Sequence, residues 1–181
     1  DFAINQFIRE RFFFPINKAK ILSSNVVFEG KFKEKKDASL YMALLNSTLV
    51  FLSVDVSSRF SMGDGFLTFY GPDIAKLLIP DAKFISDKYK KEILEAFEEL
   101  LERPIKVISE EIKMKDRQEF DSLVLESLGL DSEKYLPLIY DSLVNLVKER
   151  QNLGATRKKT RQIKVERDIE KLKEEVIKEI I

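Results

Sequence analysis

The sequence predicts an α+β fold, with a small mixed α/β half followed by a helical half. In the first half, short aromatic and β-branched runs alternate with a long apolar segment. From Ser86 onward, apolar residues recur at helical spacing, and proline or glycine separates the segments. We expect residues 1–85 to form a unit around a buried central helix at 38–58. Residues 86–152 would then form a helical subdomain, and residues 153–181 a basic segment and a C-terminal helix.

Short elements are expected at the start of the chain. Residues 1–10 carry Phe2, Ile4, Phe7 and Ile8, which suits a short helix. Arg11–Pro15 and Val26–Phe32 have the aromatic and β-branched composition that is typical of strands.

The apolar segment Leu40–Val56 follows Asp37, a suitable N-cap residue. Apolar side chains fall on nearly every side of this segment, which indicates a buried helix. A loop then leads to a strand at Phe66–Tyr70. Asp73 is the expected cap of a helix at Ile74–Ile79, since Pro80 would end it.

The second half of the chain reads as a series of capped helices. Ser86 is the expected N-cap of a helix that continues to Arg103, where Pro104 follows. A further helix is expected at Arg117–Leu128. Gly129 suits the position after its end, and Asp131 suits the N-cap of the next helix, which contains Pro137.

The composition excludes several functional classes. The chain of 181 residues has neither histidine nor cysteine. Zinc fingers, disulfide frameworks, cysteine nucleophiles and serine–histidine triads therefore cannot be built from it alone. The longest uncharged stretch, Ala38–Val54, is shorter than the ~20 apolar residues of a membrane span. We expect a soluble cytoplasmic chain with no membrane partner, and the start at Asp1 suggests a piece of a longer protein.

Balanced totals of 31 basic and 31 acidic residues hide an uneven charge distribution. Residues 9–36 contain eight bases and three acids, and residues 148–167 contain eight bases and two acids. Residues 87–126 contain twelve acids and eight bases. Two basic stretches could contact a polyanion without making the whole chain basic, although charged runs are commonly solvated surface.

Two motifs for catalysis or nucleotide binding are weak. Gly63-Asp64-Gly65 lacks the third glycine of a dinucleotide loop and precedes a strand, so a tight turn is the simpler interpretation. Asp81, Glu111 and Lys113 match a nuclease-like set of metal-binding acids and a lysine. A metal site needs its acids close together, whereas a helical pattern separates these.

A binding surface is the stronger candidate. Lysine and arginine neutralise phosphates, asparagine and arginine bond base edges, and glycines let backbone N–H groups approach a phosphate. The first half of the chain supplies residues of all these kinds, and the predicted DNA-binding residues are Arg11, Lys18, Lys20, Asn25, Arg59, Ser61, Gly63 and Gly65. No catalytic residue and no metal ligand is predicted.

The order of several short motifs resembles a known protein family. These motifs are Phe14-Pro15-Ile16, Leu44-Leu45-Asn46-Ser47-Thr48-Leu49, Ser58-Arg59, Gly63-Asp64-Gly65, a strand to Tyr70, Leu78-Ile79-Pro80, and the helical segments 119–130 and 139–150. Together they are similar to the C-terminal target-recognition region of N6-adenine-specific DNA methyltransferases of restriction–modification systems. The resemblance covers most of residues 10–150.

The resemblance implies that this chain is the DNA-reading (specificity) domain of a larger methyltransferase or fused restriction–modification enzyme. Double-stranded DNA and an upstream methyltransferase domain would be its partners. S-adenosylmethionine and the catalytic Asn/Asp-Pro-Pro-aromatic motif would belong to that upstream domain. The fragment itself would then be no enzyme and would hold no cofactor.

An alternative is a helical protein-interaction module that mediates subunit assembly. The last segment, Ile163–Ile181, has apolar residues at helical spacing and no obvious core to join. On this hypothesis it packs against another subunit or a second copy of the chain. The two hypotheses can both hold.

Overall fold

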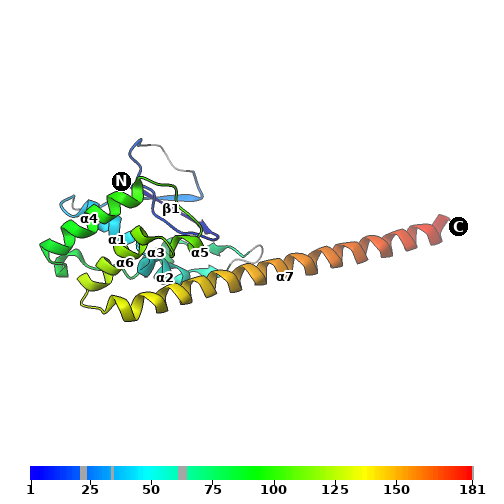
Figure 1. Ribbon diagram of the computed structural model, residues 1–181. Coiled ribbons are helices and arrows are strands. Elements are labelled where there is room, and N and C mark those ends of the chain that lie inside the picture. The colour runs from blue at the N-terminus through cyan, green and yellow to red at the C-terminus, as the bar shows by residue number, and fades with distance from the viewer. Residues whose placement is uncertain (21–23, 34, 61–64, 181) are drawn as a thin grey trace.

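The structure, a computed structural model, describes the backbone of residues 1–20, 24–33, 35–60 and 65–180. Side chains are described for these residues up to 165 and for Glu170. The α+β class is confirmed: two small antiparallel sheets lie against a set of helices (Figure 1). The helices are α1 (Ala38–Leu45), α2 (Thr48–Ser57), α3 (Gly71–Ile74), α4 (Asp87–Leu101), α5 (Ile108–Glu111), α6 (Lys115–Ser127) and α7 (Ser132–Ile180), with a 3-10 turn at Ala82–Phe84.

The two sheets are built largely from the start of the chain. In the first sheet, β1 (Phe2–Asn5) pairs with β3 (Val27–Gly30), so that Ile4 lies opposite Phe28. In the second sheet, β5 (Leu67–Thr68) lies between β2 (Phe7–Ile8) and β4 (Arg59–Phe60).

The predictions for residues 1–10 and 11–15 are wrong. Residues 1–10 form β1 and β2 because each finds a strand partner distant in sequence. Arg11–Pro15 is not a strand. The side-chain amide of Asn46 instead accepts from the Phe14 N–H at 3.0 Å and donates to the Phe14 carbonyl at 3.1 Å. These bonds satisfy backbone groups that a neighbouring strand would otherwise pair.

The predicted central helix is two helices, α1 and α2, bent by 65° at Asn46-Ser47. The Ser47 hydroxyl accepts from the Val50 N–H at 3.3 Å and caps α2. The buried carboxylate of Asp121, from α6, accepts from the Thr48 N–H at 2.9 Å. The Asn-Ser pair therefore acts as a helix break, because side chains rather than a preceding turn satisfy the first N–H groups of α2.

The next short helix also differs from the expectation. Asp73 lies inside α3, where its carboxylate accepts from the Tyr70 N–H at 3.1 Å, and so it does not cap a helix at 74–79. Later caps are confirmed. Ser86 accepts from the Tyr89 N–H at the start of α4, Gly129 has φ +74° after α6, and Asp131 accepts from the Lys134 N–H.

The last element is a single long helix rather than a helix, a basic segment and another helix. α7 has 49 residues, or roughly 70 Å at the usual rise per residue, and contains Pro137 near its start. Its first part packs against α2 and α6, and its second part projects away from the body (Figure 1). The basic residues after 152 are therefore carried on a helix that leaves the protein core.

One cluster of buried side chains connects both halves of the body. Phe12, Phe51 and Phe69 in the first half belong to the same cluster as Phe120 and Leu143 in the second. Their contacts hold the sheets, α1 and α2 against α4, α6 and α7. Among the described residues, no single helix is long and apolar enough to span a membrane, and only α1 and α2 taken together across their bend pass such a test.

Candidate nucleic-acid interface

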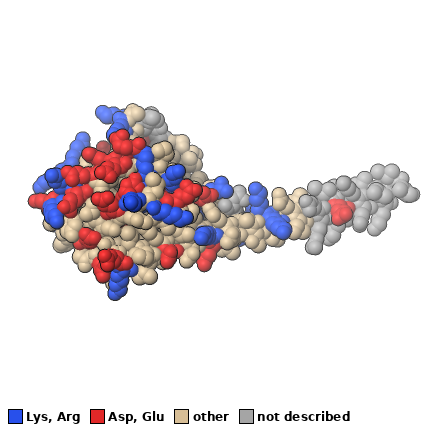
Figure 2. Space-filling view, in the orientation of Figure 1, with Lys and Arg blue, Asp and Glu red and all other residues tan. Residues whose placement is uncertain are grey.

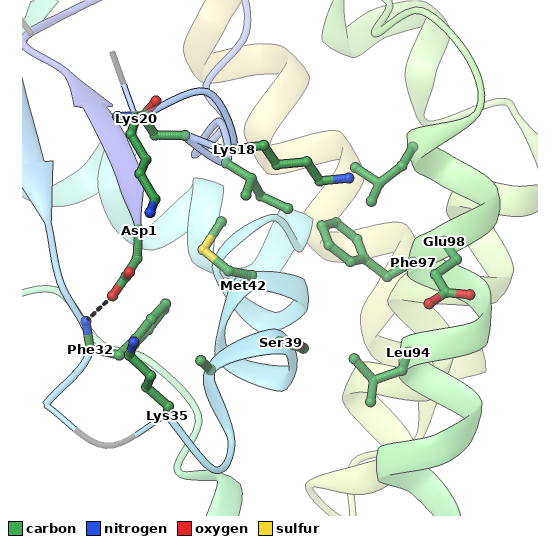
Figure 3. A pocket seen from close by; sticks show the side chains of 14 residues that line it. Asp1, Lys18, Lys20, Phe32, Lys35, Ser39, Met42, Leu94, Phe97 and Glu98 are labelled. Atoms are coloured by element: carbon green, nitrogen blue, oxygen red, sulfur yellow. Dashed lines mark hydrogen bonds between the residues drawn. The ribbon is translucent and has the colours of Figure 1, made fainter. Parts of the chain in front are cut away.

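A cavity of about 600 Å³ lies between α1, α4 and the segment after Pro15 (Figure 3). Two of the predicted DNA-binding residues, Lys18 and Lys20, line it. Lys35 joins them from the segment before α1. The other lining residues are Asp1, Ile16, Asn17, Phe32, Ala38, Ser39, Met42, Leu94, Phe97, Glu98 and Leu101.

The backbone of residues 16–20 places the two lysines at this cavity. Ile16 forms an isolated bridge with Phe2, and the Asn17 N–H donates to the Asp1 carbonyl at 3.0 Å. The Lys20 N–H then donates back to the Asn17 carbonyl at 3.3 Å, and Lys20 has φ +51°. Lys20 thus has a left-handed backbone conformation, which is uncommon for residues other than glycine.

The apolar floor of the cavity comes from one face of each neighbouring helix. Leu94, Phe97 and Leu101 follow one another at spacings of three and four along α4. Met42 lines the cavity from α1, and Figure 3 shows the Phe97 ring projecting from α4 toward the middle of the cavity. Met42 and Phe97 are buried, whereas Leu101 is half exposed, so apolar surface is open to a ligand at the rim.

The charge at the cavity is predominantly positive. Three lysines face two carboxylates, those of Asp1 and Glu98. The Asp1 carboxylate accepts from the Phe32 N–H at 3.0 Å. Within the described ranges, none of the three ammonium groups forms an ion pair with a carboxylate. These cations are therefore available to an anion from solution.

Arg11, another predicted DNA-binding residue, lies inside the protein. Its side chain is 10% exposed, 4.0 Å from Glu111 and over the ring of Phe51. Burial, together with the neighbouring Arg117 charge, lowers the pKa of Arg11 to about 10. It lines a second cavity of about 330 Å³, which shares Lys18 and Phe97 with the first. Arg11 therefore serves the internal charge network rather than the exposed lysine cluster.

The remaining predicted residues are not brought to the main cavity. Arg59, on β4, is 64% exposed, and its guanidinium lies 3.5 Å from the Asp73 carboxylate and over the Tyr70 ring. Asn25 is exposed just before β3. Ser61 and Gly63 lie outside the described residues.

Gly65 has a packing role that the sequence did not indicate. It is buried with φ +79°, and its carbonyl accepts from an Nη of Arg150 at 3.0 Å. A Cβ atom at this position would lie 2.8 Å from the Arg150 carbonyl oxygen. The glycine thus allows the chain to approach the backbone of α7, a partner inside the protein rather than a phosphate.

A second group of exposed cations lies where α7 leaves the body. Its members are exposed and have no acid between them in sequence: Arg157, Lys158, Lys159, Arg161 and Lys164. Arg157 lies over the ring of Phe60 at 4.8 Å, and Lys158 lines a cavity of about 520 Å³ together with Arg9. Figure 2 shows mixed charges over the body and basic residues along the projecting helix. On the side shown in Figure 2, the basic residues of the projecting helix are thus separated from the mixed charges of the body.

The nuclease-like motif does not assemble into a metal site in the described part of the chain. The Glu111 carboxylate is buried and bonded to Arg103 and Arg117. The Asp81 carboxylate accepts from the Lys83 N–H and the Tyr41 hydroxyl. Among the described residues, no group of three or more histidine, cysteine, aspartate or glutamate side chains could hold a metal ion.

Sequence reasoning missed Lys35, Phe97 and Glu98 as cavity residues. Lys35 lies in the first basic stretch, so the charge distribution contained a signal for it. Phe97 and Glu98 belong to an amphipathic helix whose pattern gives no sign of which segment it faces. Only the packing of α4 beside α1 brings them to the two predicted lysines.

No protein-family model matches this chain, and the searches of curated proteins and of solved structures find no match either.

Proposed function

We propose that this chain binds double-stranded DNA as the target-recognition part of an N6-adenine DNA methyltransferase. The observation that carries the proposal is the convergence of Lys18, Lys20 and Lys35 on one cavity without carboxylate partners among the described residues. The basic segment of α7 supplies further cations for the phosphate backbone. The ordered motifs of the sequence support the family assignment.

The proposal places methyl transfer elsewhere in the parent protein. The chain contains neither the glycine-rich loop of a methyl-donor site nor the catalytic tetrapeptide. Of the motif residues it does contain, Asn46 and Ser47 hold the break between α1 and α2, and Gly65 packs on α7. S-adenosylmethionine would therefore bind an upstream domain, and we assign this chain the contacts to DNA.

A triple variant with alanine in place of Lys18, Lys20 and Lys35 is expected to bind duplex DNA more weakly and with a smaller salt dependence. Each phosphate contact contributes about 0.9 to the slope of log K against log salt concentration, so the slope should fall by about 2–3. The measurement is fluorescence anisotropy of a mixed-sequence duplex across a salt series. The single variants Arg59→Ala and Lys18→Ala are measured across the same salt series.

Lys134→Ala is the matched control, since Lys134 is an exposed lysine near the start of α7, away from the cavity. Its slope should equal that of the wild type. An unchanged slope in the triple variant would remove the cavity from the interface. A wild-type protein that does not bind duplex DNA at low salt would count against the proposed function itself.

Subunit assembly through α7 is the second candidate function. The observation that favours it is the projection of this helix from the body with exposed apolar side chains: Ile163 is 44% and Val165 56% exposed. The side chains that would continue this apolar stripe lie outside the described residues. Apolar side chains on a lone helix gain stability by packing against a partner.

Light scattering measures the mass of the protein in solution and so distinguishes a monomer from an assembly of several copies. If α7 mediates assembly, the wild type has the mass of a dimer or larger species, and a chain truncated after residue 162 is a monomer. Truncation leaves the buried cluster intact, because its last member is Val147. A monomeric wild type at high protein concentration would exclude self-association and leave only assembly with a different protein.

A further inference from the structure

The cavity between α1 and α4 combines two kinds of surface, one cationic and one apolar. Lys18, Lys20 and Lys35 supply cations, whereas Ile16, Leu94 and Leu101 supply apolar contact. Ile16 and Leu101 are 37% and 50% exposed, so this apolar surface is accessible. A ligand that fills the cavity must therefore carry an anionic group and an apolar face within the same small unit.

A nucleotide has this combination. Its phosphate suits the lysines, and its base has an apolar face and a polar edge. The Ser39 hydroxyl and the exposed Glu98 carboxylate also line the cavity, and both can bond the edge of a base. At about 600 Å³ the cavity lies within the usual range of roughly 300–1,000 Å³ for small-ligand sites.

A base in a regular duplex cannot use such a cavity. Its faces are covered by neighbouring bases, and a concave site reaches it only after it leaves the stack. Unstacking and unpairing cost a few kcal/mol, which the new contacts must offset.

We infer that this cavity accepts one unstacked nucleotide of the bound DNA. The base lies against Ile16, Leu94 and Leu101, and the adjacent phosphates contact the lysines. This nucleotide would be distinct from the adenine on which a methyltransferase domain acts. The inference rests on the proposed function, because it requires DNA to be bound.

The test compares two labelled duplexes that differ only at one central base pair, which is matched in one and mismatched in the other. A mismatched base is already partly unstacked, so it enters the cavity at lower cost. The wild type should bind the mismatched duplex about tenfold more tightly. Titrations of both duplexes by fluorescence anisotropy at one fixed salt concentration measure this ratio.

Two cavity-filling variants test where the base goes. Leu101→Trp and Ser39→Trp each place a large side chain into the cavity from an exposed position, so the buried core is unchanged. In both, the ratio should fall to about one, because the added indole ring occupies the volume that the unstacked base would fill. Leu138→Trp is the control, because Leu138 is 57% exposed on α7 and does not line the cavity; it should keep the wild-type ratio.

The outcomes separate the inference from the function on which it rests. Equal affinity of the wild type for both duplexes, with salt-dependent binding, would overturn the inference and leave DNA binding standing. So would a preference for the mismatch that persists in both filled variants. An absence of binding to either duplex at low salt would overturn both.

Discussion

Glu111→Gln is expected to lower the free energy of unfolding by about 3–5 kcal/mol, the usual cost of removing one partner of a buried ion pair. Glu111 is 1% exposed and lies at the centre of a network of arginines. Its two carboxylate oxygens accept from Arg103 at 3.0 and 3.1 Å and from Arg117 at 3.1 Å. The same carboxylate accepts from the Lys106 N–H at 3.0 Å.

The buried arginines around Glu111 explain why the loss of unfolding free energy should be large. Arg117 is 3% exposed, and Arg11 is also confined to the interior, so neither can recover a full hydration shell when the carboxylate is neutralised. Arg117 also donates to the Asn46 carbonyl at the break between α1 and α2. Urea unfolding followed by circular dichroism measures the change. Glu110→Gln is the neighbouring exposed control, and its loss should stay below about 0.5 kcal/mol.

The loss of unfolding free energy in Glu111→Gln should also depend on pH. Burial raises the pKa of Glu111, but the hydrogen bonds from Arg103 and Lys106 and the charges of Arg117 and Arg11 outweigh it, and the pKa lies below its usual value. A carboxyl with a lowered folded pKa contributes stability above its unfolded pKa and loses it as pH falls through the folded value. The difference between wild type and variant should therefore be constant near neutrality and shrink below about pH 4. A difference that grows on acidification would contradict this assignment.

Arg150→Met is expected to cost a similar amount, about 3–5 kcal/mol, because it leaves a buried carboxylate without its cation. Arg150 is 4% exposed, and its guanidinium donates to the Asp55 carboxylate at 2.7 Å. It also donates to the carbonyls of Arg9 at 2.6 Å and Gly65 at 3.0 Å. The Arg150 side chain thus connects α7 to α2 and to the segments next to β2 and β5.

A double-mutant cycle isolates this pair. Asp55→Asn removes the charge that Arg150→Met would leave unpaired, so the double variant should lose clearly less than the sum of the two single losses. Arg157→Met is the matched control: Arg157 is exposed and stacks on Phe60, a contact worth about 0.5–1 kcal/mol at such a site. Additive losses at Asp55 and Arg150 would show that the ion pair is not what fixes α7 to the body.

Three helix ends in the second half were predictable because their signals are local. Ser86, Gly129 and Asp131 bond or turn within a few residues, and the structure has each at its predicted helix end. Strand partners were not predictable. Phe2–Asn5 has the composition of a short helix and becomes a strand only because Val27–Gly30 lies beside it. The break at Asn46-Ser47 likewise depends on Phe14, Asp121 and Arg117, which are distant in sequence.

For the candidate interface, the sequence identified Lys18 and Lys20 but placed Arg11 and Gly65 beside them. A basic residue in a basic stretch looks the same whether it faces solvent or a buried acid. Arg11 faces Glu111, which follows it by a hundred positions, and Gly65 faces Arg150. Burial of these two residues depends on which elements pack together, and the composition of a segment does not predict this.

By itself, the sequence determined the α+β class, the capped helices of the second half and the two basic stretches, since periodicity, cap residues and charge are properties of neighbouring positions. The tertiary structure alone decided which of the described cations are buried and which are exposed. It buries Arg11 in a network of charges, binds Gly65 to α7 and brings Lys18, Lys20 and Lys35 around a cavity floored by α4. The reason is physical: a buried charge requires a partner and an exposed one does not, and the fold assigns the partners.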